Sequence, residues 1–188
     1  MKRRGPLPIL AILLTTVLGV SCGGERSSQI AESLLRLDQI EAALDAVDAE
    51  VGSGKAVQLF EVNATELVVN VFVATDLDGT PNSDGRPDGV IHFVFSEQDG
   101  LETAPEAVAA SGPTFARSAL DFDSASILSA VTTELPASSP EMFVMTAAGT
   151  VENPTGVVEY RVLLQSPQGG QLSVLLTNQG EIIGTDAS

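Results

Sequence analysis

Residues 66–96, with the sequence ELVVNVFVATDLDGTPNSDGRPDGVIHFVFS, contain the pattern that decides the fold. Two segments rich in β-branched and aromatic residues, Glu66–Thr75 and Gly89–Ser96, are typical of β-strands. Residues 76–88 between them are rich in Gly, Pro, Asp and Asn, which favour turns and exclude regular structure. The order strand, loop, strand predicts an antiparallel pair.

Further segments of the same character lie on both sides of this pair, separated by turn residues. The predicted strands are Lys55–Val62, a short strand within Phe115–Leu120, Met142–Ala147, Gly156–Gln165, Gln171–Thr177 and Glu181–Thr185. Residues 97–120 are otherwise weakly patterned and are interpreted as a connector. Short connections between successive strands predict antiparallel pairing throughout.

Two helices are predicted, one before each group of strands. In Ile30–Val51, apolar residues recur at steps of three and four, which forms one stripe suited to packing on a sheet. The second helix starts at Asp123, a residue type that caps helix N-termini, and Phe122 and Ile127 occupy the positions of a hydrophobic staple. It ends near Leu135, because Pro136 follows.

The two halves of the chain follow the same order of helix and three strands. Residues 43–51 (ALDAVDAEV) align with residues 127–135 (ILSAVTTEL). We therefore predict a single α+β domain over residues 30–188, made of two α-β-β-β repeats at about 30–100 and 121–188. The expected architecture is one antiparallel sheet with both helices on one face.

This element order resembles that of small bacterial envelope lipoproteins. The tandem arrangement resembles the β-lactamase inhibitor protein fold, and each half is similar to the propeptide-like domains of secreted peptidases. The lipid-carrier lipoproteins of mycobacterial type are a second comparison, and that resemblance implies a larger sheet with an internal cavity. These resemblances concern element order over roughly residues 30–185 and imply a fold without implying site residues.

Residues 1–21 have the features of a secretory signal peptide. Lys2, Arg3 and Arg4 form a basic start, and the apolar run over residues 7–20 is shorter than the roughly 20 residues of a membrane-spanning helix. Small residues lead to Cys22, the only cysteine, in an arrangement that resembles the lipobox of bacterial lipoproteins, although Gly19 stands where the lipobox usually has Leu.

The resemblance implies that Cys22 is acylated and becomes the first mature residue. Residues 22–29 would then form a polar tether between an extracytoplasmic domain and the lipid anchor in a bacterial membrane. The alternative is an ordinary cleaved signal that leaves a free thiol at Cys22.

The charge of the chain is strongly acidic, with a formal net charge of −16. Three of the nine basic residues precede Cys22, whereas all 25 acidic residues follow it. Such a surface repels phosphate backbones, which excludes nucleic acid as a partner. The absence of Trp and the single Tyr also argue against aromatic platforms for sugars.

The sequence gives little support for an enzyme. His92 is the only histidine, and the domain predicted over residues 30–188 contains no Gly-x-Ser-x-Gly motif. A second His or a further Cys for a zinc site is also missing from the sequence. The alternation in residues 90–95 turns His92 away from the aromatic face of its strand, so an exposed strand histidine is the expected state.

The acidic loop is the best candidate for a metal ligand, and no other cofactor is expected. Oxygen-bearing side chains suited to Ca²⁺ occur at five of its positions: Asp76, Asp78, Asn82, Asp84 and Asp88. The EF-hand template fails, because Arg86 and Phe95 occupy its third and twelfth positions when counted from Asp84. The alternative is a solvated hairpin loop in which Asp and Asn stabilise tight turns.

The face of the sheet opposite the helices is the candidate binding surface. Alternation predicts that it carries a mixture of polar and apolar side chains: Val68, Asn70, Phe72, His92, Val94, Glu159, Arg161 and Leu163. The expected function is a membrane-anchored, non-enzymatic module that binds an envelope protein or has a structural role. The alternative is a carrier of an apolar or lipid ligand in a cavity between the sheet and the helices.

Overall fold

The computed structural model describes residues 35–52, 57–80, 82, 85–104, 106–150, 154–166 and 168–187. The predicted signal peptide, Cys22, the tether, the first residues of the first predicted helix and Asp84 lie outside the described residues. The prediction of an α+β fold with an antiparallel sheet is confirmed, because the described residues contain the helices α2 and α3 beside a single sheet whose strand pairs are all antiparallel.

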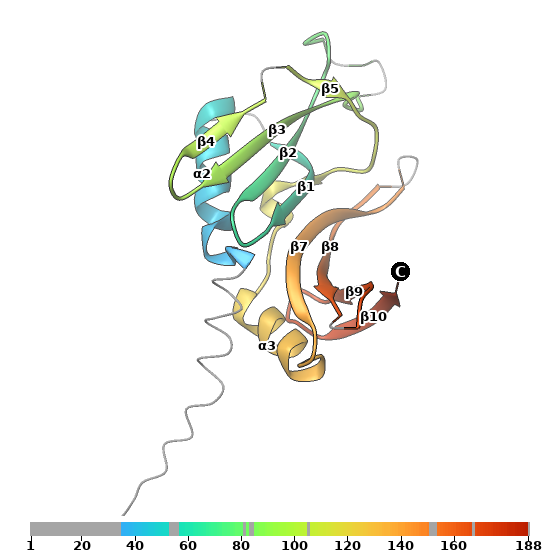
Figure 1. Ribbon diagram of the computed structural model, residues 1–188. Helices are drawn as coiled ribbons and strands as arrows, with labels where there is room; N and C mark the ends of the chain where they lie inside the picture. Colours follow the sequence, from blue (N-terminus) through green and yellow to red (C-terminus); the bar gives the residue numbers. More distant parts are fainter. Residues whose placement is uncertain are drawn as a thin grey trace, which may run out of the picture.

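The main path of the sheet runs in the order β10-β9-β8-β7-β1-β2-β3-β4. Its strands are β1 (Gln58–Ala64), β2 (Val69–Thr75), β3 (Gly89–Ser96), β4 (Gly100–Thr103), β7 (Ser139–Gly149), β8 (Pro154–Gln165), β9 (Gln171–Leu176) and β10 (Ile182–Ala187). Two short strands pair beside this path, β5 (Val108–Ala109) with β3 and β6 (Phe115–Ala116) with β1. The first strands of the two halves, β1 and β7, thus pair with each other. From this pair each half extends outward as a meander (Figure 1).

One face of this sheet is buried. Valines at alternate positions of β2, Val69, Val71 and Val73, are at most 6% exposed, and their cross-strand partners on β3 include Phe93. The alternation continues through β7, β8 and β9, whose buried residues join the same hydrophobic cluster. Ile40 and Leu44 of α2 (Ile40–Val51) and Ile127 and Leu128 of α3 (Ser124–Glu134) belong to that cluster as well. Both helices therefore cover the same face.

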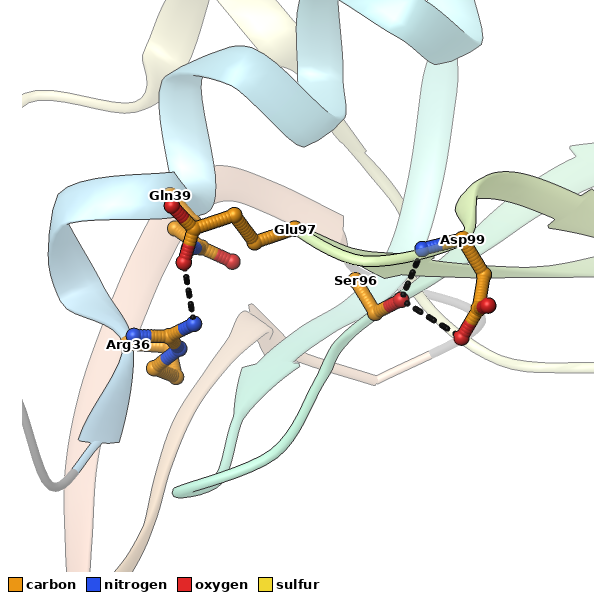
Figure 2. A network of polar contacts seen from close by, with 5 residues as sticks. All are labelled: Arg36, Gln39, Ser96, Glu97 and Asp99. Carbon is orange, nitrogen blue, oxygen red and sulfur yellow. Dashed lines mark hydrogen bonds and ion pairs between the residues drawn. The ribbon is translucent and has the colours of Figure 1, made fainter.

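The prediction of a continuous helix over Ile30–Val51 is wrong, because the helix is interrupted at Arg36, where the backbone has a φ of 48°. A short 3-10 helix, η1 (Leu37–Gln39), follows it, and α2 starts at Ile40. Glu97, in the turn between β3 and β4, contacts the residues at this interruption. Arg36 Nη2 lies 2.8 Å from Glu97 Oε2, and Gln39 Nε2 donates to the same oxygen at 3.3 Å (Figure 2). A tertiary contact from a distant turn thus overrides the helical periodicity.

The connector also differs from the prediction. Residues 100–103 form β4, a fourth strand of the first half, although the sequence there shows little alternation. After β6, Arg117 begins the 3-10 helix η2 (Arg117–Ala119) and forms ion pairs with Glu41, Asp45 and Asp48 on one side of α2. One guanidinium group therefore attaches the connector to the first helix.

Candidate functional site

The open face, defined as the face of the sheet opposite the helices, carries two rows of side chains that cross the strands. In the first row each residue is the cross-strand partner of the next: His92, Phe72, Glu61, Thr146 and Glu159. The second row is built in the same way from Val94, Asn70, Asn63, Val144 and Arg161. Both rows span the junction of the two halves, where β1 pairs with β7.

Four of these residues form a continuous chain of hydrogen bonds across β1, β2 and β3. Asn63 Nδ2 donates to Glu61 Oε1 at 2.6 Å, and Asn70 Nδ2 donates to Asn63 Oδ1 at 2.8 Å. His92 Nε2 lies 2.9 Å from Asn70 Oδ1. Asn63 is only 6% exposed, so this chain, which we call the amide relay, satisfies a polar group that would be costly to bury unpaired.

The carboxylate end sets the direction of the relay. An ionised carboxylate can only accept hydrogen bonds, so Asn63 must present its NH₂ group to Glu61 and its oxygen to Asn70. Asn70 must then present its own oxygen to the imidazole, which requires a proton on His92 Nε2. Nδ1 is the remaining ring nitrogen, and it is not among the buried unpaired atoms of the described chain. In the neutral ring it is therefore the acceptor.

The ring of Phe72 lies against His92. The two rings are parallel, with an interplanar angle of 1° and 4.4 Å between centroids. This separation is close to the strand spacing of about 4.8 Å, so the rings stack along the cross-strand direction. The second face of Phe72 is consequently turned toward β1, where its partner in the row is Glu61.

A shallow depression of about 590 Å³ lies beside the relay, over β7 and β8. Its polar side chains are those of Glu61, Thr146, Glu159, Arg161 and Ser173, and its apolar side chains are those of Met142, Val144, Ala147 and Leu163. Arg161 Nη2 pairs with Glu159 Oε2 at 2.9 Å. Glu61, in contrast, has no cationic partner among the described residues and bonds only to Asn63.

The structure brings most of the predicted binding-face residues into these rows. Asn70, Phe72, His92, Val94, Glu159 and Arg161 are members, and Leu163 lines the depression. Val68 lies outside the rows, just before β2 begins. Sequence reasoning missed Glu61, Asn63, Val144 and Thr146.

A β-bulge explains why Glu61 and Asn63 were missed. The register between β1 and β2 shifts between Leu59 and Glu61, so that Leu59 lies on the buried face while Glu61 lies on the open face. Simple alternation would have placed Leu59 and Glu61 on the same side. Glu61 is flanked by Phe60 and Val62, and this local sequence does not show where the register shifts.

The acidic loop uses its described polar groups for its own turns. Asp78 Oδ1 accepts from the N–H of Thr80 at 2.8 Å, and Asn82 Nδ2 donates to the carbonyl of Arg86 at 2.8 Å. The N–H of Leu77 donates to Asp88 Oδ1 at 2.9 Å, which together with Asn82 holds the pKa of Asp88 below its usual value. Among the described residues no group of three or more His, Cys, Asp or Glu side chains could hold a metal ion, and the calcium interpretation, which includes Asp84, stays a prediction.

Comparison of the chain with family models, with curated proteins and with solved structures finds no match in any of the three. Within the described ranges, none of the helices has the length and apolar character needed to cross a membrane.

Proposed function

We propose that the chain is a membrane-anchored, extracytoplasmic lipoprotein that binds a partner protein on its open face and does not act as an enzyme. The basic and apolar N-terminal segment followed by Cys22 supports the anchor. The single observation that carries the binding function is the construction of the open face, where an ordered polar relay, a stacked aromatic pair and a depression adjoin one another.

The contrast between the two faces of the sheet favours contact of the open face with a partner protein over exposure of that face to solvent alone. Helices cover one face, whereas the other leaves Phe72, Val94, Val144 and Leu163 only partly buried. Exposed faces that are partly apolar are one mark of an interaction surface. The same patch contains the half-buried Phe72 and the exposed Arg161. Aromatic residues and Arg are among the residue types that contribute most to protein interfaces.

The packing of the interior favours a binding module over a lipid carrier. Large side chains fill the space between sheet and helices, and Phe93, Phe115 and Phe143 are each at most 2% exposed. A carrier needs an enclosed apolar cavity of a few hundred Å³. The depression on the open face is shallow and has five polar residues in its lining, which suits side chains of a protein better than an acyl chain.

We also infer that the domain is built from two α-β-β-β units. The mirrored strand order around the β1–β7 pair and the position of one helix before each meander support this inference. On this interpretation the open face is a composite surface, because its rows begin in the first unit and end in the second.

The proposal is tested with a photo-crosslinking phenylalanine analogue introduced separately at Phe72 and at Ala49, an exposed position on α2. We expect a protein adduct from Phe72 in the membrane fraction of producing cells and none from Ala49. The same fractions report the anchor, since Cys22→Ser should move the protein to the soluble fraction. Adducts from Ala49 alone would contradict the open-face assignment, and membrane retention of Cys22→Ser would contradict the lipid anchor.

A further inference from the structure

We propose that the depression on the open face receives a basic side chain, Lys or Arg, from the partner protein, with Glu61 as its counter-ion. This inference rests on the proposed partner-binding function and specifies the chemistry of the partner. We call the group formed by Glu61, the free face of Phe72, Thr146 and Glu159 the cation site.

The charges of the cation site are the first argument. Glu159 is already paired with Arg161, whereas the carboxylate of Glu61 accepts one hydrogen bond from a neutral amide and lacks a cation among the described residues. The depression therefore carries a net negative charge. The whole chain carries a formal charge of −16, so long-range attraction also favours a basic partner surface.

The geometry of the first row is the second argument. Glu61 and Glu159 lie on either side of Thr146, one strand away in each direction, so their Cα atoms are roughly 10 Å apart. A cationic group above Thr146 can reach both carboxylates. The hydroxyl of Thr146 makes no hydrogen bond within the described residues and can accept one from the same cation.

Phe72 supplies the third argument. One face of its ring is covered by His92, and the other is turned toward Glu61. A cation held by Glu61 would lie near that second face, where the negative potential of the ring attracts it. Val144, Met142 and Leu163 in the lining of the depression provide an apolar surface for the methylene groups of a Lys or Arg stem.

The amide relay connects the cation site to a spectroscopic signal. Asn63 donates to Glu61, Asn70 donates to Asn63, and His92 bonds to Asn70. A cation that withdraws electron density from Glu61 weakens the first of these bonds and changes the resonances of both Asn side-chain amides and of the His92 ring. General attraction to an acidic surface would leave these resonances unmoved.

The test uses NMR titration of the full mature chain in detergent with two peptides, acetyl-Leu-Lys-Leu-amide and acetyl-Leu-Gln-Leu-amide. We expect saturable shifts of the Asn63, Asn70 and His92 side chains with the lysine peptide and no such shifts with the glutamine peptide. Glu61→Gln should weaken lysine-peptide binding about tenfold, which equals about 1.4 kcal/mol. Phe72→Leu, which retains the charge, should also weaken it.

The matched control is Glu50→Gln, which makes the same chemical change at an exposed position on α2. It should leave the titration unchanged. Equal shifts from the two peptides, or equal weakening by Glu50→Gln and Glu61→Gln, would overturn the cation site. If the Phe72 crosslinker still captures a protein in that case, the partner-binding proposal stands while the basic side chain is refuted.

Discussion

At the scale of single residues, the most informative group is the amide relay that ends at His92. Its hydrogen bonds have one direction because Glu61 can only accept. Reversing the relay would turn an amide oxygen toward the carboxylate and leave that pair unsatisfied, at a cost of about 1–3 kcal/mol. The tautomer of a surface histidine is thus set by a carboxylate two strands away.

We predict that the neutral His92 ring carries its proton on Nε2, and that Glu61→Gln raises the fraction protonated on Nδ1. A glutamine can donate as well as accept, so the relay loses its fixed direction. Long-range ¹H–¹⁵N correlation spectra of the imidazole measure the two tautomers. Glu159→Gln is the control, because Glu159 bonds to Arg161 outside the relay. An unchanged tautomer ratio in Glu61→Gln would show that the relay does not control His92.

At the scale of elements, α3 begins where its sequence predicts. Asp123 caps the helix, and its Oδ1 accepts from the N–H groups of Ala125 at 3.1 Å and Ser126 at 3.2 Å. The hydroxyl of Ser126 donates to Oδ2 at 2.8 Å. These bonds, led by that of the Ser126 hydroxyl, lower the pKa of Asp123.

We predict that Asp123→Ala lowers the free energy of unfolding by about 1 kcal/mol, since the first turn loses its acceptor. For a chain of this size the melting temperature should fall by about 2–4 °C. Asp123→Asn, which still caps, should have a smaller effect.

The Asp123 cap also has a predicted pH dependence. Because the folded pKa is lowered, the stabilisation by ionisation is present above the unfolded value of about 3.9 and is lost as the pH falls through the folded pKa. Thermal melts of wild type and Asp123→Asn should therefore converge in acid. A difference that stays constant down to the lowest pH would contradict a role for the ionised cap.

The elements show which parts of the fold local sequence can predict. The Asp123 cap, the staple of Phe122 and Ile127 and the alternation in β2 and β3 are local signals, and each predicted element formed there. The break at Arg36 and the strand β4 depend on contacts with distant residues, Glu97 and β3 respectively. The bulge at Leu59/Glu61 is likewise a property of the pairing with β2, so β1 alone could not reveal which face Glu61 occupies.

At the scale of the whole molecule, the pairing of β1 with β7 determines the site. Each half alone would carry one part of each row, and only the antiparallel junction places Glu61 and Asn63 next to Thr146 and Val144. The sequence predicts two similar halves but contains no local signal for which strands meet between them. For this reason His92, Phe72 and Arg161 were predictable as members of one face, whereas the depression between Glu61 and Glu159 was not.

The central claim is that the open face is the surface that binds the partner protein. Hydroxyl-radical footprinting of the protein in native membranes and after purification tests it most directly. Met142, Phe72 and Leu163 report on the open face, and the exposed side chains of Leu67 and Leu77, which lie in turns between strands, serve as controls. We predict that the three open-face residues are oxidised several-fold more slowly in membranes than in the purified protein, while Leu67 and Leu77 are oxidised equally in both. Equal oxidation of the open-face residues in the two samples would contradict the account.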